Sequence, residues 1–395
     1  MSDASLDAKL DASLNFASLD IAICGAGPVG MALAALLVGR GLAPDRVGLL
    51  DAKTLAHAGA DPRSLALSQG SRLILEEIGA WPLPATEIHQ IHVSRRGRLG
   101  RSLIDRAEHG VPALGYVARY GDVVTALGAV CARLGVRALR PSRVQDCRED
   151  AAGVTLTLAR EEGGEGERAL RADLVVQAEG GLYNEQRGRA VRRDYGQTAI
   201  IAQVWVGAGI AARAYERFTD EGPLALLPQD DGYALVWCLR PDSAQAVLAL
   251  DEAAFLARLE QAFGGRLGHF TRAGARLAYP LGLNADPRAS ARTVAIGNAA
   301  QTLHPVAGQG LNLGLRDAAV LARVLAHGTT PADLARFTAR RATDRRLTIG
   351  LTDTMARIFT GGGPLQSLLG ASLGLLDALA PARAALAEQM MYGSR

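Results

Sequence analysis

The sequence predicts an α/β fold, because glycine-rich turns join strand-like to helix-like segments at two distant places in the chain. The first turn lies between an apolar run of strand type, Leu19 to Cys24, and a helix-like run, Met31 to Val38. The second lies between the strand-like Thr293 to Ile296 and a helix that begins near Leu311. Between them, apolar runs rich in β-branched residues, such as Ala199 to Val206, are typical of strands. The pattern predicts strand–turn–helix units together with a strand-rich region.

Length and composition exclude several classes of protein. The chain has 395 residues, of which 49% are hydrophobic and 21% are charged, and this balance indicates folded domains rather than intrinsic disorder. A formal net charge of +3 over this length gives no electrostatic signature of nucleic-acid binding. The four cysteines stand far apart without a CxxC pair, so we expect neither disulfides nor a metal site, and we expect a reducing, cytoplasmic location.

The first glycine-rich turn has the residues of a dinucleotide-binding site. Its sequence, Gly25-Ala26-Gly27-Pro28-Val29-Gly30, matches the G-x-G-x-x-G pattern in the required context of strand and helix. Gly25 permits a tight turn, Gly27 lets a pyrophosphate approach the backbone, and Gly30 lets the helix pack on the strand. The helix N-terminus, where we expect Pro28 to lie beside the cofactor, offers free N–H groups to phosphate.

Asp51 supports the same interpretation. It ends the next apolar run, Val47 to Leu50, about 20 residues after Gly30, which is the spacing of the acid that binds an adenosine ribose. An acid at this position favours a free ribose diol, so the cofactor is predicted to be FAD or NAD rather than NADP.

Two uncharged stretches, residues 21–39 and 358–375, are long enough to be tested as membrane spans. Glycines and a proline interrupt both, so we expect neither to form a continuous spanning helix. Residues 1–18 carry acidic residues and lack the basic and apolar segments of a signal peptide, so we expect a flexible extension there.

The second glycine-rich element favours FAD over NAD. Residues 292–317 run from the strand through Gly297-Asn298 and a loop into a helix. An extended cofactor needs a second helix N-terminus for its far end, and a helix dipole aimed at a flavin stabilises the negative charge that the ring gains on reduction. The residues expected at this end of FAD are Gly297, Asn298, Pro305, Gly308, Gly310, Leu311 and Asn312.

Together the two elements resemble the flavin motifs of the aromatic-ring hydroxylases, which are flavin monooxygenases with the p-hydroxybenzoate hydroxylase fold. Two stretches resemble the ubiquinone-biosynthesis branch of this family, and within it most of all the 2-polyprenyl-6-methoxyphenol hydroxylases. They are Gly-Asn-Ala-Ala-Gln-Thr-Leu-His-Pro over 297–305 and Ala-Gly-Gln-Gly-Leu-Asn-Leu-Gly over 307–314. The resemblance extends over about residues 19–393, and it includes Tyr215-Glu216-Arg217-Phe218 and the stretch from Arg341 through Asp353.

The resemblance implies a division into domains. Segments 19–75, 105–180 and 275–325 are expected to form a discontinuous, Rossmann-like FAD-binding domain. Segments 80–104 and 181–274 are expected to form a β-sheet substrate domain. Residues 326–395 are expected to form a C-terminal helical region.

The resemblance also implies a reaction. NADH or NADPH reduces FAD, and O2 then gives a C4a-hydroperoxyflavin that hydroxylates the ring of a polyprenylated methoxyphenol in ubiquinone biosynthesis. Such a substrate implies contact with other ubiquinone-biosynthesis proteins or with a membrane surface, and in a bacterium a location peripheral to the inner membrane. Two alternatives stay open. One is another enzyme of this fold, such as a small-phenol hydroxylase or an isoprenoid reductase. The other is a catalytically silent flavin-binding scaffold.

Few catalytic residues follow from the sequence. By resemblance, Arg63 reaches the flavin, and His304 and Pro305 lie beside its ring, with a structural hydrogen bond as the alternative role for His304. No catalytic base stands out. The candidates for positioning a phenolic substrate, each with core packing as the alternative, are Tyr215, Tyr233 and Tyr279.

Two positions depart from the family pattern. Asn298 stands where the family usually has Asp, and its amide can still bond the ribityl chain. The middle motif, usually Gly-Ala-Asp-Gly, is here Gln177-Ala178-Glu179-Gly180. In the family this motif contacts cofactor phosphates and helps to admit the nicotinamide donor, so the change motivates the scaffold alternative.

Overall fold

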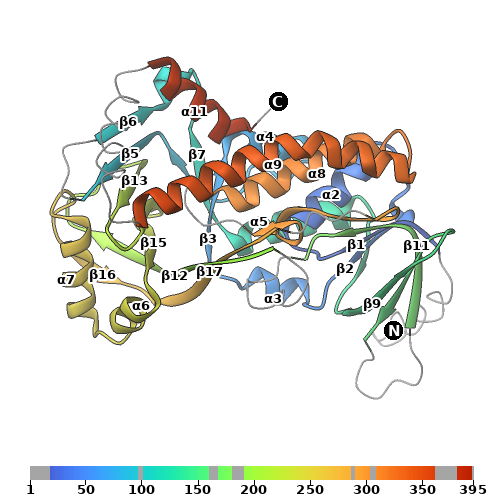
Figure 1. Ribbon diagram of the computed structural model, residues 1–395, viewed down its shortest axis with the longest axis horizontal. Helices are drawn as coiled ribbons and strands as arrows, with labels where there is room; N and C mark the ends of the chain where they lie inside the picture. Colours follow the sequence, from blue (N-terminus) through green and yellow to red (C-terminus); the bar gives the residue numbers. More distant parts are fainter. Residues whose placement is uncertain are drawn as a thin grey trace.

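In the part of the chain that the structure describes, the fold comprises three β-sheets and the helices that cover them (Figure 1), which confirms the predicted α/β class. The computed structural model describes residues 18–96, 101–159, 168–179, 191–285, 290–302, 308–360 and 380–393. The expected N-terminal extension, apart from residue 18, and most of the second uncharged stretch lie outside these residues.

The seven-stranded sheet holds the first glycine-rich turn. β1 (Leu19–Cys24) lies between β2 (Val47–Leu50) and β11 (Arg168–Gln177), and all three run parallel. β8 (Arg137–Leu139) pairs parallel with β2, and β18 (Thr293–Ala295) pairs parallel with β11. Because parallel strands end at the same edge of a sheet, the turns after β1 and β18 come together there. An antiparallel pair completes the sheet: β9 (Val144–Glu149) and β10 (Val154–Leu158).

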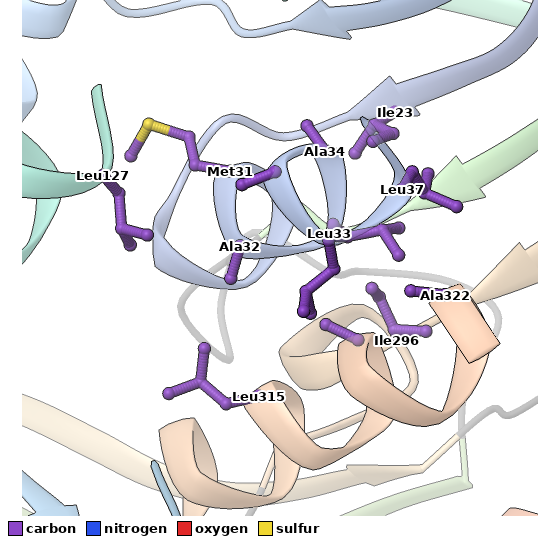
Figure 2. Packing of buried hydrophobic residues seen from close by; sticks show 14 of the residues in the cluster. Ile23, Met31, Ala32, Leu33, Ala34, Leu37, Leu127, Ile296, Leu315 and Ala322 are labelled. Atoms are coloured by element: carbon purple, nitrogen blue, oxygen red, sulfur yellow. The ribbon is translucent and has the colours of Figure 1, made fainter. Parts of the chain in front are cut away.

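Helix α2 (Pro28–Gly39) is buried on nearly every side, which explains why its sequence is apolar all round. Figure 2 shows α2 with Leu33 directed toward helix α8 (Gln309–Leu325) and Met31 toward Leu127 of helix α5 (Tyr120–Arg133). Burial of one such side chain contributes about 1.5–3 kcal/mol.

The first uncharged stretch is therefore a strand, a turn and a buried helix, as predicted. No helix within the described ranges is both long and apolar enough to cross a membrane.

A three-stranded antiparallel sheet lies between the two larger sheets in the order β3 (Ser64–Ser68), β7 (Gly115–Arg119), β4 (Ala85–Ile88). Ile88 and Val117 of this sheet pack against Ala214 of the substrate-side sheet.

The nine-stranded sheet forms the substrate side. Its strands, in spatial order, are β19 (Gln301–Thr302), β17 (Leu277–Ala285), β12 (Val191–Val206), β15 (Gly232–Leu239), β14 (Pro223–Gln229), β13 (Arg213–Phe218), β5 (Gln90–Arg95) and β6 (Arg101–Asp105), and β16 (Phe270–Ala273) pairs with β12. Helices α6 (Pro241–Leu248) and α7 (Glu252–Phe263) cover one face, where Trp237 and Phe255 are fully buried.

Strand β17 departs from the predicted domain division. The sequence placed residues from 275 onward in the cofactor domain, but β17 pairs antiparallel with β12 along nine residue pairs. Since backbone pairing joins it to β12, β17 belongs to the substrate-side sheet, and the chain returns to the cofactor side only at β18.

The C-terminal region is helical where it is described. α9 (Pro331–Thr360) lies along α8, and α11 (Ala380–Tyr392) packs near helix α4 (Gln69–Glu77) (Figure 1). The remaining helical segments are short: η1 (Pro44–Arg46), α3 (Leu55–Gly59), η2 (Arg106–His109) and η3 (Gly297–Ala299).

Candidate functional site

The first glycine-rich turn tolerates no side chain at two of its glycines. Gly25 has a φ of +106°, and a Cβ there would lie 2.6 Å from the backbone of Ala178 and Glu179, which directly follow β11. A Cβ on Gly30 would lie 1.9 Å from the carbonyl oxygen of Gly25. The glycines therefore allow β1, β11 and α2 to approach at backbone contact, as the motif predicts.

The N-terminus of α2 is open to a ligand. Gly27 is its N-cap residue and makes no side-chain cap, and Pro28 occupies the first turn, so within the described residues no side chain caps the first backbone N–H groups. A Cβ on Gly27 would meet only the hydroxyl of Tyr120, at 3.3 Å. These free donors and the positive end of the helix dipole form an anion-binding site of the kind that a pyrophosphate occupies.

Asp51 is fixed beside this turn. One carboxylate oxygen accepts a hydrogen bond from the backbone N–H of Ala26 at 2.7 Å, and the other accepts from Lys53 N–H at 2.8 Å. Arg140 lies 3.8 Å away. Because each carboxylate oxygen can accept more than one hydrogen bond, Asp51 retains acceptor capacity for a ribose hydroxyl.

Glu179 lies at the same turn and carries the departure from the family motif. Its backbone nitrogen borders Gly25, and burial, together with the charge of Asp51, raises the pKa of its carboxyl group. The two carboxylates at this turn, Asp51 and Glu179, are therefore close enough to repel each other.

Arg63 is held near the turn by two neighbours. Its Nε lies 2.9 and 3.0 Å from the two carboxylate oxygens of Asp61, its Nη2 lies 2.7 Å from one of them, and the guanidinium carbon lies 5.0 Å from the ring centre of Tyr120. Arg63 is thus placed beside Tyr120, whose hydroxyl borders Gly27, and its contact with flavin stays a prediction. Tyr120 was not predicted as a site residue, because it lies far from the motif in the chain.

The second glycine-rich element touches the first. Gly297 (φ +59°) and Gly314 both face Val29 of the first motif, and a Cβ on Gly314 would lie 2.7 Å from its side chain. Elements about 270 residues apart in the sequence therefore form one site, as the FAD prediction requires.

No side chain of the described residues caps the start of α8 either. Its N-cap residue, Gly308, has a φ of +58°, and a Cβ there would lie 2.8 Å from the Ala66 side chain on β3. At Gly310 the space is open, with the Asn298 side chain 3.7 Å away, and Leu311 is partly buried. His304 and Pro305 lie outside the described residues.

Asn312 makes its contacts within the protein. Its side-chain oxygen accepts hydrogen bonds from Ser68 N–H at 2.8 Å and from the Ser71 hydroxyl at 2.7 Å. Its NH2 group donates to the carbonyl oxygens of Ala66 and Gly308. Asn312 therefore ties the beginning of α8 to β3, which positions the residues predicted to meet the flavin.

A buried ion network anchors the same element and was not predicted. Asp317 on α8 is fully buried and accepts hydrogen bonds from Gly297 N–H, from Arg341 at 2.7 Å and from Arg345 at 3.0 Å. Arg341 also pairs with Asp344. The two arginines come from α9, so a helix beyond the motif holds Gly297 in place.

The tyrosine candidates lie in different surroundings. Tyr215 is fully buried on the α7 side of the sheet, with its ring 5.6 Å from Phe263 and 6.0 Å from Tyr233. This placement fits core packing. Tyr279 on β17 is close enough to Arg63 to contribute to the pKa of the guanidinium group.

The arrangement fits FAD and gives no sign of a metal. Two uncapped helix N-termini meet at one site, with a carboxylate for a ribose at one end. Across the described part of the chain, no group of three or more His, Cys, Asp or Glu residues is placed to hold a metal ion.

Comparison with known proteins decides the family. Residues 18–345 match the family model described as FAD binding domain. The chain is 34% identical over 382 residues to ubiquinone hydroxylase UbiL of Rhodospirillum rubrum, a match that covers 92% of this chain and 87% of the relative. The chain belongs to the FAD-dependent hydroxylases of ubiquinone biosynthesis. The hydroxylase is therefore an FAD-dependent monooxygenase, as the sequence motifs predict.

Other comparisons agree with this assignment. The hydroxylase is 30% identical over 350 residues to 3-demethoxyubiquinol 3-hydroxylase of Escherichia coli, covering 82% of this chain and 86% of that protein. Its fold matches p-nitrophenol 4-monooxygenase PnpA from Pseudomonas putida with a TM-score of 0.74 over 96% of this chain and all of that one. At 18% identity, the second match supports the fold alone.

Proposed function

We propose that this hydroxylase adds one hydroxyl group to the ring of a polyprenylated methoxyphenol, with NADH or NADPH as the electron donor. The observation that carries the proposal is the contact of the two glycine-rich elements through Val29. The names of the relatives, ubiquinone hydroxylase and 3-demethoxyubiquinol 3-hydroxylase, support a prenylated aromatic substrate.

The residues have distinct tasks in this proposal. The N-terminus of α2 binds the pyrophosphate of FAD, Asp51 binds its ribose, and the N-terminus of α8 stabilises negative charge at the far end. When bound, FAD supplies the activation of O2 and the transfer of one oxygen atom to the ring. The protein orients the ring and excludes water from it.

The substrate's tail determines where the hydroxylase works. A polyprenyl chain is insoluble in water, so we propose that the enzyme, otherwise cytoplasmic, meets its substrate at the inner membrane surface or receives it from other ubiquinone-biosynthesis proteins. Flotation with lipid vesicles tests the first route: an enzyme that stays at the bottom of the gradient contradicts it.

The substrate is tested by deleting the gene in its source organism and extracting the quinones. We expect a prenylated phenol that lacks one ring hydroxyl to accumulate, and we expect wild-type enzyme, but not a Gly30→Ala variant, to restore ubiquinone. Accumulation of an isoprenoid with additional double bonds would favour the reductase alternative. Unchanged quinones together with loss of growth on a small phenol would favour the small-phenol hydroxylase.

A further inference from the structure

One row of side chains on the nine-stranded sheet differs from the row next to it in its exposure to solvent. The row follows cross-strand pairs from β5 to β17, and all of its members are at least partly exposed. Its members, in order, are Val93, Glu216, Ala225, Val236, Ile201 and Leu277. The next row, which includes Phe218, Cys238 and Ala199, is buried. Glu216 is the single charged residue in an otherwise apolar, accessible row.

Alternation along β13 shows which way Glu216 points. Tyr215 and Arg217, its neighbours in the strand, both contact Phe263 of α7. Because successive strand residues point to opposite faces, Glu216 faces away from α6 and α7.

The face that carries Glu216 is the face turned toward the cofactor elements. Ala214, two residues before Glu216, packs with Ile88 and Val117 of the three-stranded sheet. That sheet includes β3, where Ala66 touches Gly308 at the start of α8. The row of Glu216 therefore borders the region between the substrate-side sheet and the second flavin element.

The Glu216 carboxylate has no partner in the part of the chain that the structure describes. Its Oε1 is buried without a hydrogen bond, and neither oxygen takes part in an ion pair there. Burial raises the pKa of this carboxyl group to about 7. An unpaired carboxylate in apolar surroundings costs stability, so its presence indicates a partner that arrives with the ligand.

We propose that Glu216 accepts the proton of the ring hydroxyl of the substrate. The inference rests on the phenolic substrate proposed above. In this step the phenol O–H bond breaks, a new O–H bond forms on the Glu216 carboxylate, and the electron pair stays on the phenolate oxygen. The phenolate enriches the ring with electrons for attack on an electrophilic oxygen. The proton returns to the ring oxygen when the product leaves, so no oxidant or reductant is needed for this step.

Among the residues that the structure describes, few charged or titratable groups share the sheet face of Glu216. Arg95 on β5 and Cys238 on β15 share its face one row away, and Tyr279 lies at the far side of the same face. Burial and then the charge of Glu216 raise the pKa of the Cys238 thiol, so this thiol stays neutral near pH 7. A general base works best when its pKa lies near the working pH, and Glu216 meets this condition.

The test compares wild-type holoenzyme with Glu216→Gln, which keeps the size of the side chain and removes the base. A short-chain prenyl methoxyphenol is added to the oxidised enzyme, and the ultraviolet difference spectrum reports neutral phenol or phenolate. We expect phenolate in the wild type, increasing as pH rises through about 7 because Glu216 must be ionised to accept a proton. In Glu216→Gln we expect bound neutral phenol, a kcat lower by about 10²–10⁴-fold, little change in KM and no pH dependence near 7.

Two further variants keep the test decisive. Glu216→Asp is expected to restore part of the phenolate signal and of the pH dependence. Glu260→Gln, on α7 at the other face of the sheet, is expected to behave as wild type, since Glu260 contacts His269 on the surface. Wild-type kcat and an unchanged pH profile in Glu216→Gln would overturn the proposal while leaving the proposed function intact. A wild-type enzyme that binds and hydroxylates no prenylated phenol would refute the proposed function, and the role of Glu216 with it.

Discussion

Helices α2 and α8 both begin at a glycine without a side-chain cap, but they are held in place in different ways. At α2 the backbone itself makes the contacts, because Gly25 and Gly30 allow strand and helix to touch. At α8 side chains make them: Asn312 bonds to β3, and Asp317 bonds to Gly297 and to two arginines of α9. The comparison suggests that the first element is a self-contained unit, whereas the second depends on helices elsewhere in the fold.

The largest expected effect concerns the side-chain support of α8. Asp317→Asn leaves Arg341 and Arg345 buried with one negative charge fewer, and removing one partner of a buried ion pair costs about 3–5 kcal/mol. We expect urea denaturation of the purified enzyme to show a loss of this size, together with weaker flavin retention. Asp230→Asn, which removes an exposed ion pair with Arg119, is the control and should change little. Equal effects of the two substitutions would contradict the supporting role of the network.

The next largest effect is expected at the backbone contact between α2 and the turn after β1. Gly30→Ala places a methyl group where only 1.9 Å is available, so α2 must shift from β1. We expect a loss of about 1–3 kcal/mol in the free energy of unfolding, as for other overpacked sites, and purification without FAD. Gly39→Ala, at the other end of the same helix, meets nothing within 4 Å and should retain FAD. Full flavin content in Gly30→Ala would show that the close contact is not needed.

The substitution with the smallest expected effect on stability distinguishes a loss of flavin binding from a loss of folding. At Gly310 a Cβ meets only the Asn298 side chain, 3.7 Å away, so Gly310→Ala fits the fold and favours the helix by up to about 1 kcal/mol. We expect unchanged or slightly higher stability with flavin affinity at least tenfold weaker, measured by fluorescence titration of the apoprotein with FAD. Unchanged affinity would place the flavin away from the start of α8.

The contrast between α2 and α8 also explains which features could be predicted from the sequence. The first motif is local, so its spacing alone predicted β1, the turn, α2 and the position of Asp51. The second motif was visible as glycines after a strand, and FAD followed from the pair. The contacts that hold α8 join Asp317 to residues 24 and 28 positions later, and a local pattern cannot reveal which of 41 arginines is buried beside it.

The substrate side was harder to predict for a related reason. The sequence drew attention to Tyr215 because phenol side chains often position phenols, yet Tyr215 packs against α7. The residue beside it, Glu216, appeared only within a stretch that resembles the family. Which of two neighbouring strand residues faces the cofactor depends on which sheet face the helices cover, and this is decided by tertiary packing.

The central claim, that this protein is a flavin monooxygenase acting on a prenylated phenol, is tested most directly with labelled oxygen. Purified enzyme is incubated with NADH or NADPH, a short-chain prenyl methoxyphenol and ¹⁸O2, and the product is examined by mass spectrometry. We predict a hydroxylated product that carries one ¹⁸O atom, formed only in the presence of FAD. Donor oxidation that does not respond to the phenol, or a product without the label, would contradict the claim.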